Sequence, residues 1–470
     1  MLLASIIIYL LLTILIGFWA SRRVKTSGDY MLAGRSLPLM LSSAAMFATW
    51  FGSETVFGAS SQFLEEGLYG VIEDPFGAAL CLLLFGAFFA RKLYNMNLLT
   101  LGDFFKIRFG KSTELTASLF LALPYIGYIA AQLVAMGLIL NVVTGIEQWQ
   151  CVLISAFVVT LYTYIGGMWA ISITDFVQSI LIILGLFVLA YIMSQKAGGV
   201  DVVMSKIPRE DLRFLPSFNL QEILMYIAAW SVLGLGSIPS QDVFQRAMSS
   251  GSAKTAVRSC YFAAGLYLTI AMLPIFISVC TNQLYGDQIA GDKQLALPNM
   301  VLLHTTLPIQ ILFFGSLLSA IMSTASAAIL APASIFSENL VKPLLKHRLD
   351  DQHFLFLTRF SVLLFAAVAT IMACIRSNIY ELVGESSILS LVSLFIPLVL
   401  GLYWKRSSRT GAMVAMVGGM ITWIIFEVLE TAWPSLIPAT LVSLVGMIVG
   451  SIGWPQNENE YDKSRVESIE

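Results

Sequence analysis

Two hydroxyl groups stand one helical turn from a small residue in the apolar segment 308–336. The string SLLSAIMSTASAAIL places Ala320, Ser323 and Thr324 at i, i+3 and i+4, so they share one face of a helix. Sodium is a hard cation that prefers oxygen ligands, and two hydroxyls with a backbone carbonyl supply oxygen without burying a full charge. Small residues also let helices pack closely, so the spacing alone leaves both a sodium site and a packing face open.

A second apolar segment offers backbone oxygen atoms. Residues 38–64 contain SSAAMFATWFGSETVFGASS, in which Gly52 stands among Ser, Thr and a carboxylate, a pattern that favours an interrupted helix. An unwound stretch there leaves carbonyl groups free between Ala48 and Phe51. Irregular backbone persists at membrane depth only where it lines a cavity or is buried in protein. A cation shared between these carbonyls and the hydroxyls described above would satisfy both segments.

Four carboxylates lie within or at the start of apolar segments. Glu54 is in the middle of its segment, and a charge at membrane depth is costly enough to indicate a function. Glu73, Asp74 and Asp175 each open a segment, where the helix dipole alone would also favour a carboxylate. Glu54 is therefore the strongest candidate of the four.

Aromatic side chains accompany these carboxylates. Trp50 stands beside the interruption, and Tyr128 and Trp230 lie within later apolar segments. An aromatic face with a nearby carboxylate suits an organic cation through cation–π attraction. Aromatic residues pack against lipid and protein far more often, so position singles out Trp50 alone.

The composition of the chain defines the solvent around these segments. Of the 470 residues, 57% are hydrophobic and 12% are charged, whereas soluble domains carry about 25% charged residues. A lipid bilayer is the environment that suits such a chain. The net charge of −2 and the lack of a basic patch give no reason to expect a nucleic-acid partner. The five cysteines are scattered without metal-ligand spacing, so we expect small buried side chains rather than disulfides.

Apolar runs long enough to cross a bilayer recur thirteen times, which predicts an all-α integral membrane protein. The runs cover 2–20, 38–64, 71–92, 113–143, 149–168, 173–195, 219–240, 257–282, 308–336, 354–375, 379–403, 410–429 and 436–454. With the N-terminus outside and the C-terminus inside, 21 of the 27 Lys and Arg residues fall in cytoplasmic connections. This is the asymmetry expected of cytoplasmic loops, and one missed span would destroy it.

Two of the thirteen runs look like interrupted helices. The second has the break near Gly52, and the seventh ends in GLGSIPSQDVFQR, where Pro239 and its small neighbours discourage a continuous helix. The two runs are five spans apart and so cross the membrane in opposite directions. Corresponding breaks predict inverted five-helix repeats, about 38–196 and 217–403, with a substrate site between them. Gly and Pro are common in membrane helices, which is the alternative explanation.

These segments resemble the sodium:solute symporter family over nearly the whole chain. The strings SAIMST, FATWFGSE, GGMWAISITDFVQ and RKLYNMNLLTLGDFFKIRFGK are similar to that family's motifs. The resemblance implies that Asp175 assists the inward release of sodium. It also implies a peripheral first helix and loop (1–37), a ten-helix core (38–403), two further peripheral helices (404–454) and a cytoplasmic tail (455–470). The sodium ligands it implies are Ala48, Phe51, Ala320, Ser323 and Thr324.

Within the family, the strings FATW, IP-Q--FQR---S-SA and LYTYIGGMWAISITDFVQ are similar to the high-affinity choline transporter branch. That branch binds its substrate in an aromatic cage. Trp50 and Tyr128 match two cage positions, Ser240 stands where a tryptophan is expected, and Glu54 replaces a glycine. A smaller amine or an amino acid would suit a site with less aromatic surface and an added carboxylate. The substrate-binding residues expected are Trp50, Glu54, Tyr128, Ser240 and Gln241.

We therefore expect a sodium-coupled symporter that imports a small organic solute by alternating access. Sodium is the only cofactor implied, and the partners are the small-molecule substrate and the lipid bilayer, with the protein a monomer or a loose oligomer. The absence of an N-x-S/T sequon fits a bacterial inner membrane, in which the chain would be a multi-pass protein. Two alternatives are a proton-coupled transporter with Glu54 as proton carrier and a sensor built on a transporter body. An enzyme is not expected, because no His, Cys or Asp cluster has catalytic spacing.

Overall fold

The computed structural model describes residues 1–286, 296–345, 350–431 and 433–455. The chain is 84% helix and contains no strand in the described residues, which confirms the predicted all-α class. In the first half of the chain the helices, with short 3₁₀ or π segments labelled η, are α1 (Leu2–Ser21), α2 (Ser27–Leu32), η1 (Ala33–Arg35), α3 (Leu39–Phe47), η2 (Glu54–Gly58), α4 (Ala59–Gly70), η3 (Ile72–Gly77), α5 (Ala78–Leu84), η4 (Phe85–Phe89), α6 (Ala90–Asn95), α7 (Leu101–Phe109), α8 (Lys111–Ala122), α9 (Pro124–Thr144), α10 (Gln148–Lys196) and α11 (Val200–Ser205).

The second half of the chain is built in the same way. Its elements are α12 (Leu220–Gly236), α13 (Gln241–Met248), α14 (Ala253–Ile270), α15 (Met272–Tyr285), α16 (Ala296–His304), α17 (Leu307–Ile335), η7 (Phe336–Val341), η8 (Lys342–Leu344), α18 (Asp351–Ile375), α19 (Ile379–Ser390), η9 (Leu391–Phe395), α20 (Ile396–Tyr403), α21 (Arg409–Val428) and α22 (Leu436–Gly453). Most of the tail predicted at 455–470 lies outside the described residues.

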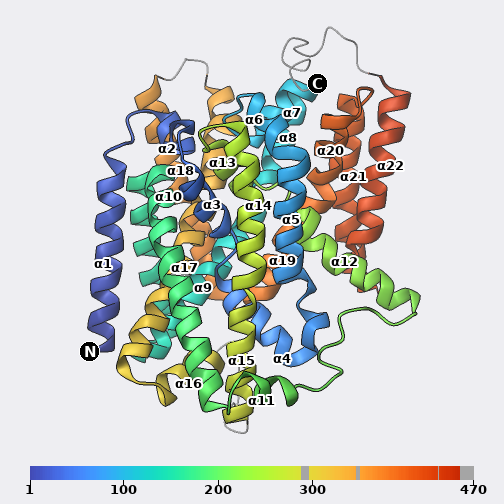
Figure 1. Cartoon of the computed structure of the whole chain (residues 1–470). Helices are drawn as coiled ribbons and strands as arrows, with labels where there is room; N and C mark the ends of the chain where they lie inside the picture. Colours follow the sequence, from blue (N-terminus) through green and yellow to red (C-terminus); the bar gives the residue numbers. More distant parts are fainter. Residues whose placement is uncertain (287–295, 346–349, 432, 456–470) are drawn as a thin grey trace.

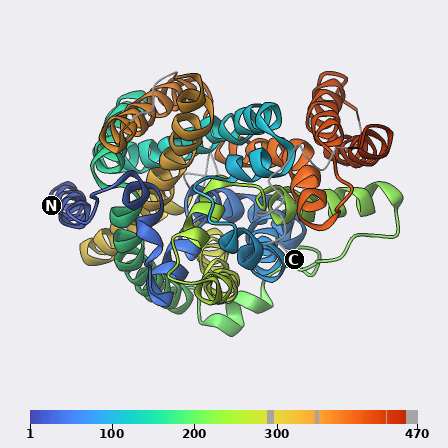
Figure 2. The ribbon, with the colours of Figure 1, turned by 90° about the horizontal axis from the view of Figure 1, so that it is seen from above.

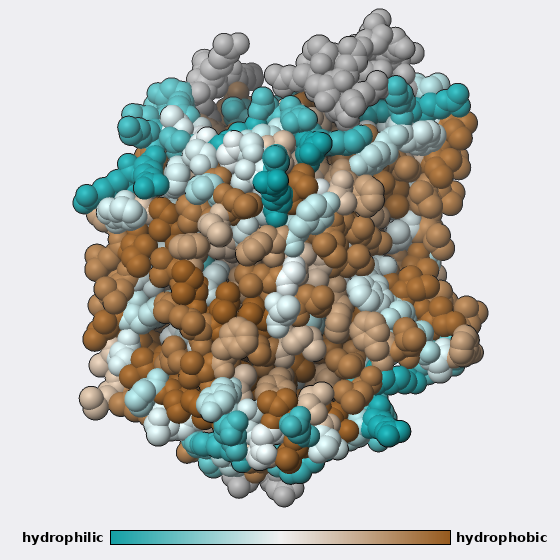
Figure 3. All heavy atoms as spheres, in the orientation of Figure 1, coloured by the Kyte–Doolittle hydropathy of each residue, from teal (hydrophilic) through white to brown (hydrophobic). Residues whose placement is uncertain are grey.

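The surface of the molecule carries an apolar belt. Hydrophobic side chains cover the middle of the face seen in Figure 3, and hydrophilic side chains gather at its two ends. Within the described residues ten helices are long and apolar enough to cross a membrane, and an eleventh span is formed if α12 and α13 count as one. The chain is therefore a multi-pass membrane protein, because only a bilayer covers such a belt.

Two of the thirteen predicted spans are not among these eleven helices. The run 38–64 is divided into α3, η2 and α4, so no single piece is long enough. The run 149–168 forms the first part of α10, which continues into the next predicted span. A helical break accounts for the first case. In the second case the apolar piece Gln148–Leu161 is shorter than a full span, although both segments are apolar and helical as expected.

The two predicted interruptions are present. Residues 48–52 form turns between α3 and η2. Residues 237–240 separate α12 from α13, whose axes are bent by 44°. Local composition explains both breaks: Gly52 lacks a side chain that would favour helix, and Pro239 cannot donate a backbone hydrogen bond. These interruptions place non-helical backbone in the interior of the helix bundle.

The first and the last described helices lie at the edges of the bundle. Figure 1 shows α1 starting at the lower face and α22 running to the upper face. Seen from above in Figure 2, α1 stands at one edge, and α21 with α22 stands on the opposite side. The helix α1 packs on α10 and α17, whereas α21 and α22 pack chiefly on each other. The remaining helices surround the two interruptions.

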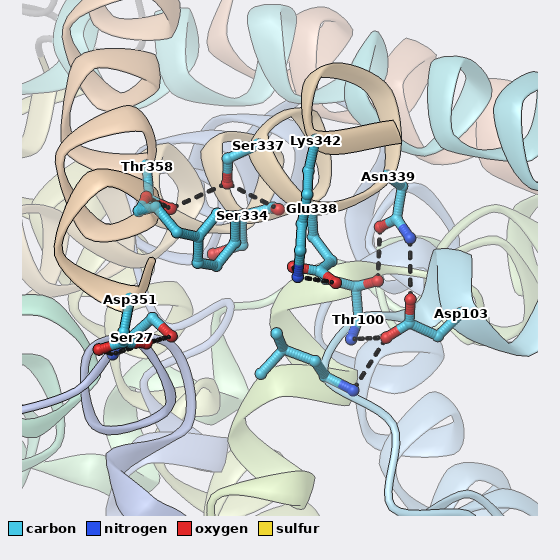
Figure 4. A network of polar contacts seen from close by, with 12 residues as sticks. Ser27, Thr100, Asp103, Ser334, Ser337, Glu338, Asn339, Lys342, Asp351 and Thr358 are labelled. Carbon is cyan, nitrogen blue, oxygen red and sulfur yellow. Dashed lines mark hydrogen bonds and ion pairs between the residues drawn. The ribbon is translucent and has the colours of Figure 1, made fainter. Parts of the chain in front are cut away.

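A polar network joins elements at the upper face (Figure 4). The amide nitrogen of Asn339 in η7 donates to Asp103 Oδ1 at 2.9 Å. The same nitrogen donates to Glu114 Oε1 at 2.9 Å. The Thr100 hydroxyl donates to Asn339 Oδ1 at 2.5 Å. Asp103 also accepts from the backbone of residues 99 and 100 and caps α7. The network fastens the α7–α8 hairpin to the end of the helix that begins as α17.

The helix α10 bends where α2 packs against it. Gly167 has φ +55° and ψ −161°, a conformation that residues with a side chain avoid. A Cβ atom at this position would lie 2.5 Å from the Tyr30 ring and 2.7 Å from the Tyr30 carbonyl oxygen. The Tyr30 hydroxyl donates to the Thr163 carbonyl at 2.9 Å. Gly167 therefore permits both the bend and the close approach of α2.

We predict that Gly167→Ala destabilises the protein by about 1–3 kcal/mol, because the backbone conformation is strained for alanine and the added carbon meets Tyr30. The measurement is the melting temperature of the purified protein in detergent. Gly265→Ala is the matched control, since Gly265 lies in α14 with open space around it. Equal melting temperatures for the two variants would contradict the prediction.

Candidate functional site

Three oxygen atoms converge where the break after α3 meets the middle of α17. The Thr324 hydroxyl donates to the Ala48 carbonyl at 3.0 Å and lies 3.2 Å from the Ala320 carbonyl. All three residues are buried. The structure thus brings together three of the five residues predicted to bind sodium, and their ligand atoms are all oxygen. This donor set suits a hard monovalent cation.

The other two predicted sodium ligands lie beside this point. The hydroxyl of Ser323, on α17, donates to Asp175 Oδ1. The Phe51 ring stacks on Phe47 with ring centroids 4.8 Å apart, and Phe51 and Ala320 line the same small apolar cavity. The structure therefore places Asp175 next to one of the predicted ligands, Ser323. The roles of these residues in sodium binding and release stay predictions.

Gly52 allows the break to approach α9 and α17 closely. A Cβ atom on Gly52 would lie 2.8 Å from Gln132 Oε1 and 2.9 Å from Thr324 Oγ1. Gln132 Oε1 accepts a hydrogen bond from the Ser53 backbone at 3.2 Å. The side chain of Gln132 thus replaces a helical partner that the interruption removes. Sequence reasoning missed Gln132, because a single polar residue in the apolar run 113–143 gives no sign of its partner 79 residues away.

Glu54 is held by donors from two helices. Its Oε2 accepts from Gln132 Nε2 at 3.0 Å and from the Ser53 hydroxyl at 3.3 Å. Its Oε1 lies 3.1 Å from the Tyr128 hydroxyl oxygen, whose single proton it shares with the Thr49 carbonyl. Only 1% of Glu54 is exposed. Three donors satisfy the carboxylate, so Glu54 fastens the broken helix to α9. Its predicted contact with substrate stays a prediction, because the residue lies outside the lining of the cavity described next.

A small cavity of about 30 Å³ is enclosed by four parts of the chain. These are the two interruptions, the helix α9 and the helix α19. Its lining includes Trp50, Tyr128 and Ser240, three of the five residues predicted to contact substrate. Gln241 is outside the lining, and its Oε1 accepts from the Leu101 backbone at 2.8 Å. The full lining consists of Trp50, Pro124, Tyr125, Tyr128, Gly236, Ser237, Ser240, Asp242, Val383, Ser386, Ser387 and Ser390.

The cavity contains one carboxylate, that of Asp242 in the first turn of α13. The Tyr125 hydroxyl donates to Asp242 Oδ1 at 2.7 Å and accepts from the Asp242 backbone N–H at 2.9 Å. Only 4% of Asp242 is exposed. Sequence reasoning overlooked this residue, although a carboxylate three positions after Pro239 in the second break was a usable signal. Asp242 joins two aromatic residues, Trp50 and Tyr128, at the same cavity.

Polar contacts also fix the backbone that carries Trp50. Its carbonyl accepts from the Thr55 hydroxyl at 3.0 Å. The oxygen atoms of Thr55 and Tyr267 are 2.6 Å apart, and the Tyr267 hydroxyl donates to Asp74 Oδ1 at 2.6 Å. Asp74 is fully buried. This carboxylate therefore supports the broken helix from behind the cavity.

Helices broken at membrane depth, oxygen atoms gathered at one break and a cavity between the two breaks define a secondary membrane transporter. The model of the sodium:solute symporter family matches residues 30–419. The chain belongs to the sodium:solute symporter family. The class is that of symporters for small solutes, and both the family and the relatives are transporters rather than enzymes.

Relatives of known function include transporters of two different solutes. The chain is 30% identical over 442 residues to the human high affinity choline transporter 1, covering 89% of this chain and 75% of that protein. It is 28% identical over 471 residues to the high-affinity proline transporter PutP of Bacillus subtilis (strain 168), covering 93% and 95%.

Solved structures agree on the fold. A Na⁺-coupled sialic acid symporter in its substrate-bound, outward-open state matches with a TM-score of 0.87 and 18% identity, covering 97% of this chain and 98% of that one. The nucleobase-cation-symport-1 family transporter Mhp1, in a closed conformation, matches with a TM-score of 0.61 and 17% identity, covering 95% and 99%. At these identities the likeness establishes the fold alone.

Proposed function

We propose that the protein imports a small organic cation together with sodium by alternating access. The observation that carries this proposal is the buried carboxylate of Asp242 in a cavity shared with Trp50 and Tyr128. A buried charge is costly unless it is compensated. A substrate with a cationic nitrogen supplies that compensation and is attracted to aromatic faces as well.

Sodium would bind between the first break and α17. The proposed ligands are the Ala48, Phe51 and Ala320 carbonyls and the Ser323 and Thr324 hydroxyls. Support comes from the short distances among Ala48, Ala320 and Thr324 and from the family to which the chain belongs. A cation at this point would bridge two separately moving segments, and so favour the arrangement in which the substrate cavity is complete. Asp175, beside Ser323, would take part in sodium release.

The chemistry of the relatives' substrates agrees with a cationic ligand. Choline and proline, after which two relatives are named, both carry a positively charged nitrogen. We therefore propose a choline-like compound, another small amine or an amino acid as substrate. The cavity of about 30 Å³ has room for about two water molecules. Substrate entry thus requires the helices around it to separate, which is the movement that alternating access supplies.

The finer architecture is part of the same proposal. We propose thirteen crossings, with inverted repeats at 38–196 and 217–403, a peripheral first helix within 1–37 and two peripheral helices within 404–454. The positive-inside asymmetry puts the upper face of Figure 1 in the cytoplasm, with the N-terminus outside. A bacterial inner membrane is the proposed location. Glu54 and Gln241 would act on the substrate indirectly, through Tyr128 and the start of α13.

We predict that the double substitution Ser323→Ala and Thr324→Ala abolishes stabilisation by sodium, because it removes both hydroxyl ligands. The measurement is the melting temperature of the purified protein in NaCl compared with KCl at equal ionic strength. Sodium at about 100 times its dissociation constant should stabilise the unmodified protein by about 2.7 kcal/mol. Ser319→Ala is the control, since Ser319 is on the same helix and bonds to the Gly315 carbonyl.

A sodium effect that survives the double substitution would refute the site assignment. Transport driven by a pH gradient in sodium-free vesicles would instead favour proton coupling on the same fold.

We predict that Asp242→Asn weakens binding of the cationic substrate by about 100-fold, because truncating one partner of a buried charge pair costs about 2–5 kcal/mol. A thermal-shift screen of choline, proline, glucose and pyruvate, each with sodium, first identifies the ligand class. The same ligand is then titrated against the variant. Ser386→Ala is the control, because Ser386 lines the cavity without charge. Stabilisation by glucose or pyruvate alone would refute the proposed substrate class.

A further inference from the structure

A buried arginine faces the carboxylate beside the proposed sodium site. Arg246 on α13 is 1% exposed, and its Nη2 lies 3.5 Å from Asp175 Oδ2. Among the described residues its Nε, Nη1 and Nη2 atoms have no hydrogen-bond partner. The guanidinium is buried, and among the described residues the carboxylate that forms an ion pair with it is that of Asp175.

Asp175 is shared between two helices. Its Oδ1 accepts from the Ser323 hydroxyl on α17, and its Oδ2 faces Arg246 on α13. Ser323 is one of the proposed sodium ligands, so a sodium ion there would lie close to the same carboxylate. A fully buried carboxylate is costly unless hydrogen-bond donors or a positive charge compensate it, and Asp175 Oδ2 has no hydrogen-bond donor among the described residues. Either Arg246 or the sodium ion can provide that positive charge.

The helix that carries Arg246 also begins at the substrate cavity. Asp242 and Arg246 are four residues apart on α13 and so lie on one face, one turn from each other. Asp242 lines the cavity and is bonded to Tyr125 of α9. A shift of α13 when the substrate meets Asp242 would therefore also move Arg246 relative to Asp175.

We propose that Arg246 is a tethered counter-cation that competes with sodium for Asp175 and thereby weakens sodium binding and speeds sodium release. The inference rests on the proposed sodium coupling. When sodium leaves, Arg246 neutralises Asp175, so the empty carrier holds no uncompensated carboxylate at that point. Arg246 is thus a positioning residue that acts on sodium through Asp175, and α13 links it to the substrate.

The test removes the charge of Arg246 and measures sodium affinity and exchange. Arg246→Gln and Arg246→Met should lower the sodium half-saturation concentration by about tenfold, in the range of couplings between contacting residues. The measurement is a thermal-shift titration of the purified full chain with NaCl, in which KCl keeps the ionic strength constant. Exchange of radioactive sodium across proteoliposome membranes should slow by a similar factor. Arg246→Lys keeps the charge and should stay within about threefold of the unmodified protein.

A matched control separates this role from simple structural support. Arg108 is also a buried arginine, and its side chain bonds to the Gly401 carbonyl and the Ser407 hydroxyl. Arg108→Gln should lower the melting temperature without changing sodium half-saturation. If Arg246→Gln behaves in the same way as Arg108→Gln, the inference is overturned while sodium coupling stands. If the unmodified protein has no sodium response, the proposed function and the inference both fail.

If the single substitutions of Arg246 prevent folding, a double variant that removes both members of the ion pair still tests the inference. Removing both members of a buried ion pair is tolerated better than removing one, so Asp175→Asn with Arg246→Met should fold. Its sodium half-saturation should lie within about threefold of that of Asp175→Asn alone, because Arg246 acts through the carboxylate. A tenfold difference between these two variants would overturn competition for Asp175.

Discussion

The structure depends on providing hydrogen-bond partners for a stretch of non-helical backbone inside the bundle. Residues 48–52 give up regular helical hydrogen bonds in a place where water cannot replace them. Side chains from two other helices take over: Thr324 donates to the Ala48 carbonyl, Tyr128 donates to the Thr49 carbonyl at 2.8 Å, and Gln132 accepts from the Ser53 backbone. The break can therefore exist only while α9 and α17 stand in contact with it.

This dependence explains why the proposed sodium site and the proposed substrate cavity both lie beside the first interruption. The same side chains that compensate the broken backbone also surround the cavity and the oxygen cluster. Tyr128, for example, bonds to the break and lines the cavity. A ligand that displaces any of these groups alters the contacts between the first broken helix and its neighbours. Movement of the helices and occupancy of the site are therefore linked through the hydrogen bonds of a few residues.

The helices, their two interruptions and one helical face could be predicted from the sequence, because each depends on residues that are close together in the chain. The apolar runs, the breaks at Gly52 and Pro239 and the common face of Ala320, Ser323 and Thr324 all follow from spacing along a helix. The boundary predicted between runs 149–168 and 173–195 lies near the kink at Gly167 within α10, but the sequence did not indicate the unusual conformation of that glycine. A glycine in an apolar run does not reveal what conformation its neighbours will impose.

The pairing of polar groups could not be predicted in this way. The pairs Tyr125–Asp242 and Asp175–Arg246 join residues 117 and 71 positions apart, and their partners are set by how the helices pack. Glu54 bonds to Gln132, Ser53 and Tyr128 and is outside the cavity lining, while Asp242 with its tyrosine partner lies in that lining. The expected contact of Glu54 with substrate stays a prediction.

The three carboxylates have the same chemistry and differ in what surrounds them. Hydrogen-bond donors surround Glu54, and an arginine faces Asp175. Asp242 accepts from the Tyr125 hydroxyl and the Val243 backbone, and it also borders a cavity in which a positively charged substrate would balance its charge. The bonds to Glu54 hold the broken helix against α9, whereas the positive charge beside Asp175 is one that the proposed sodium ion would replace. A buried carboxylate at a cavity can be compensated by a ligand, and this difference is why we propose Asp242 as the residue that selects the substrate.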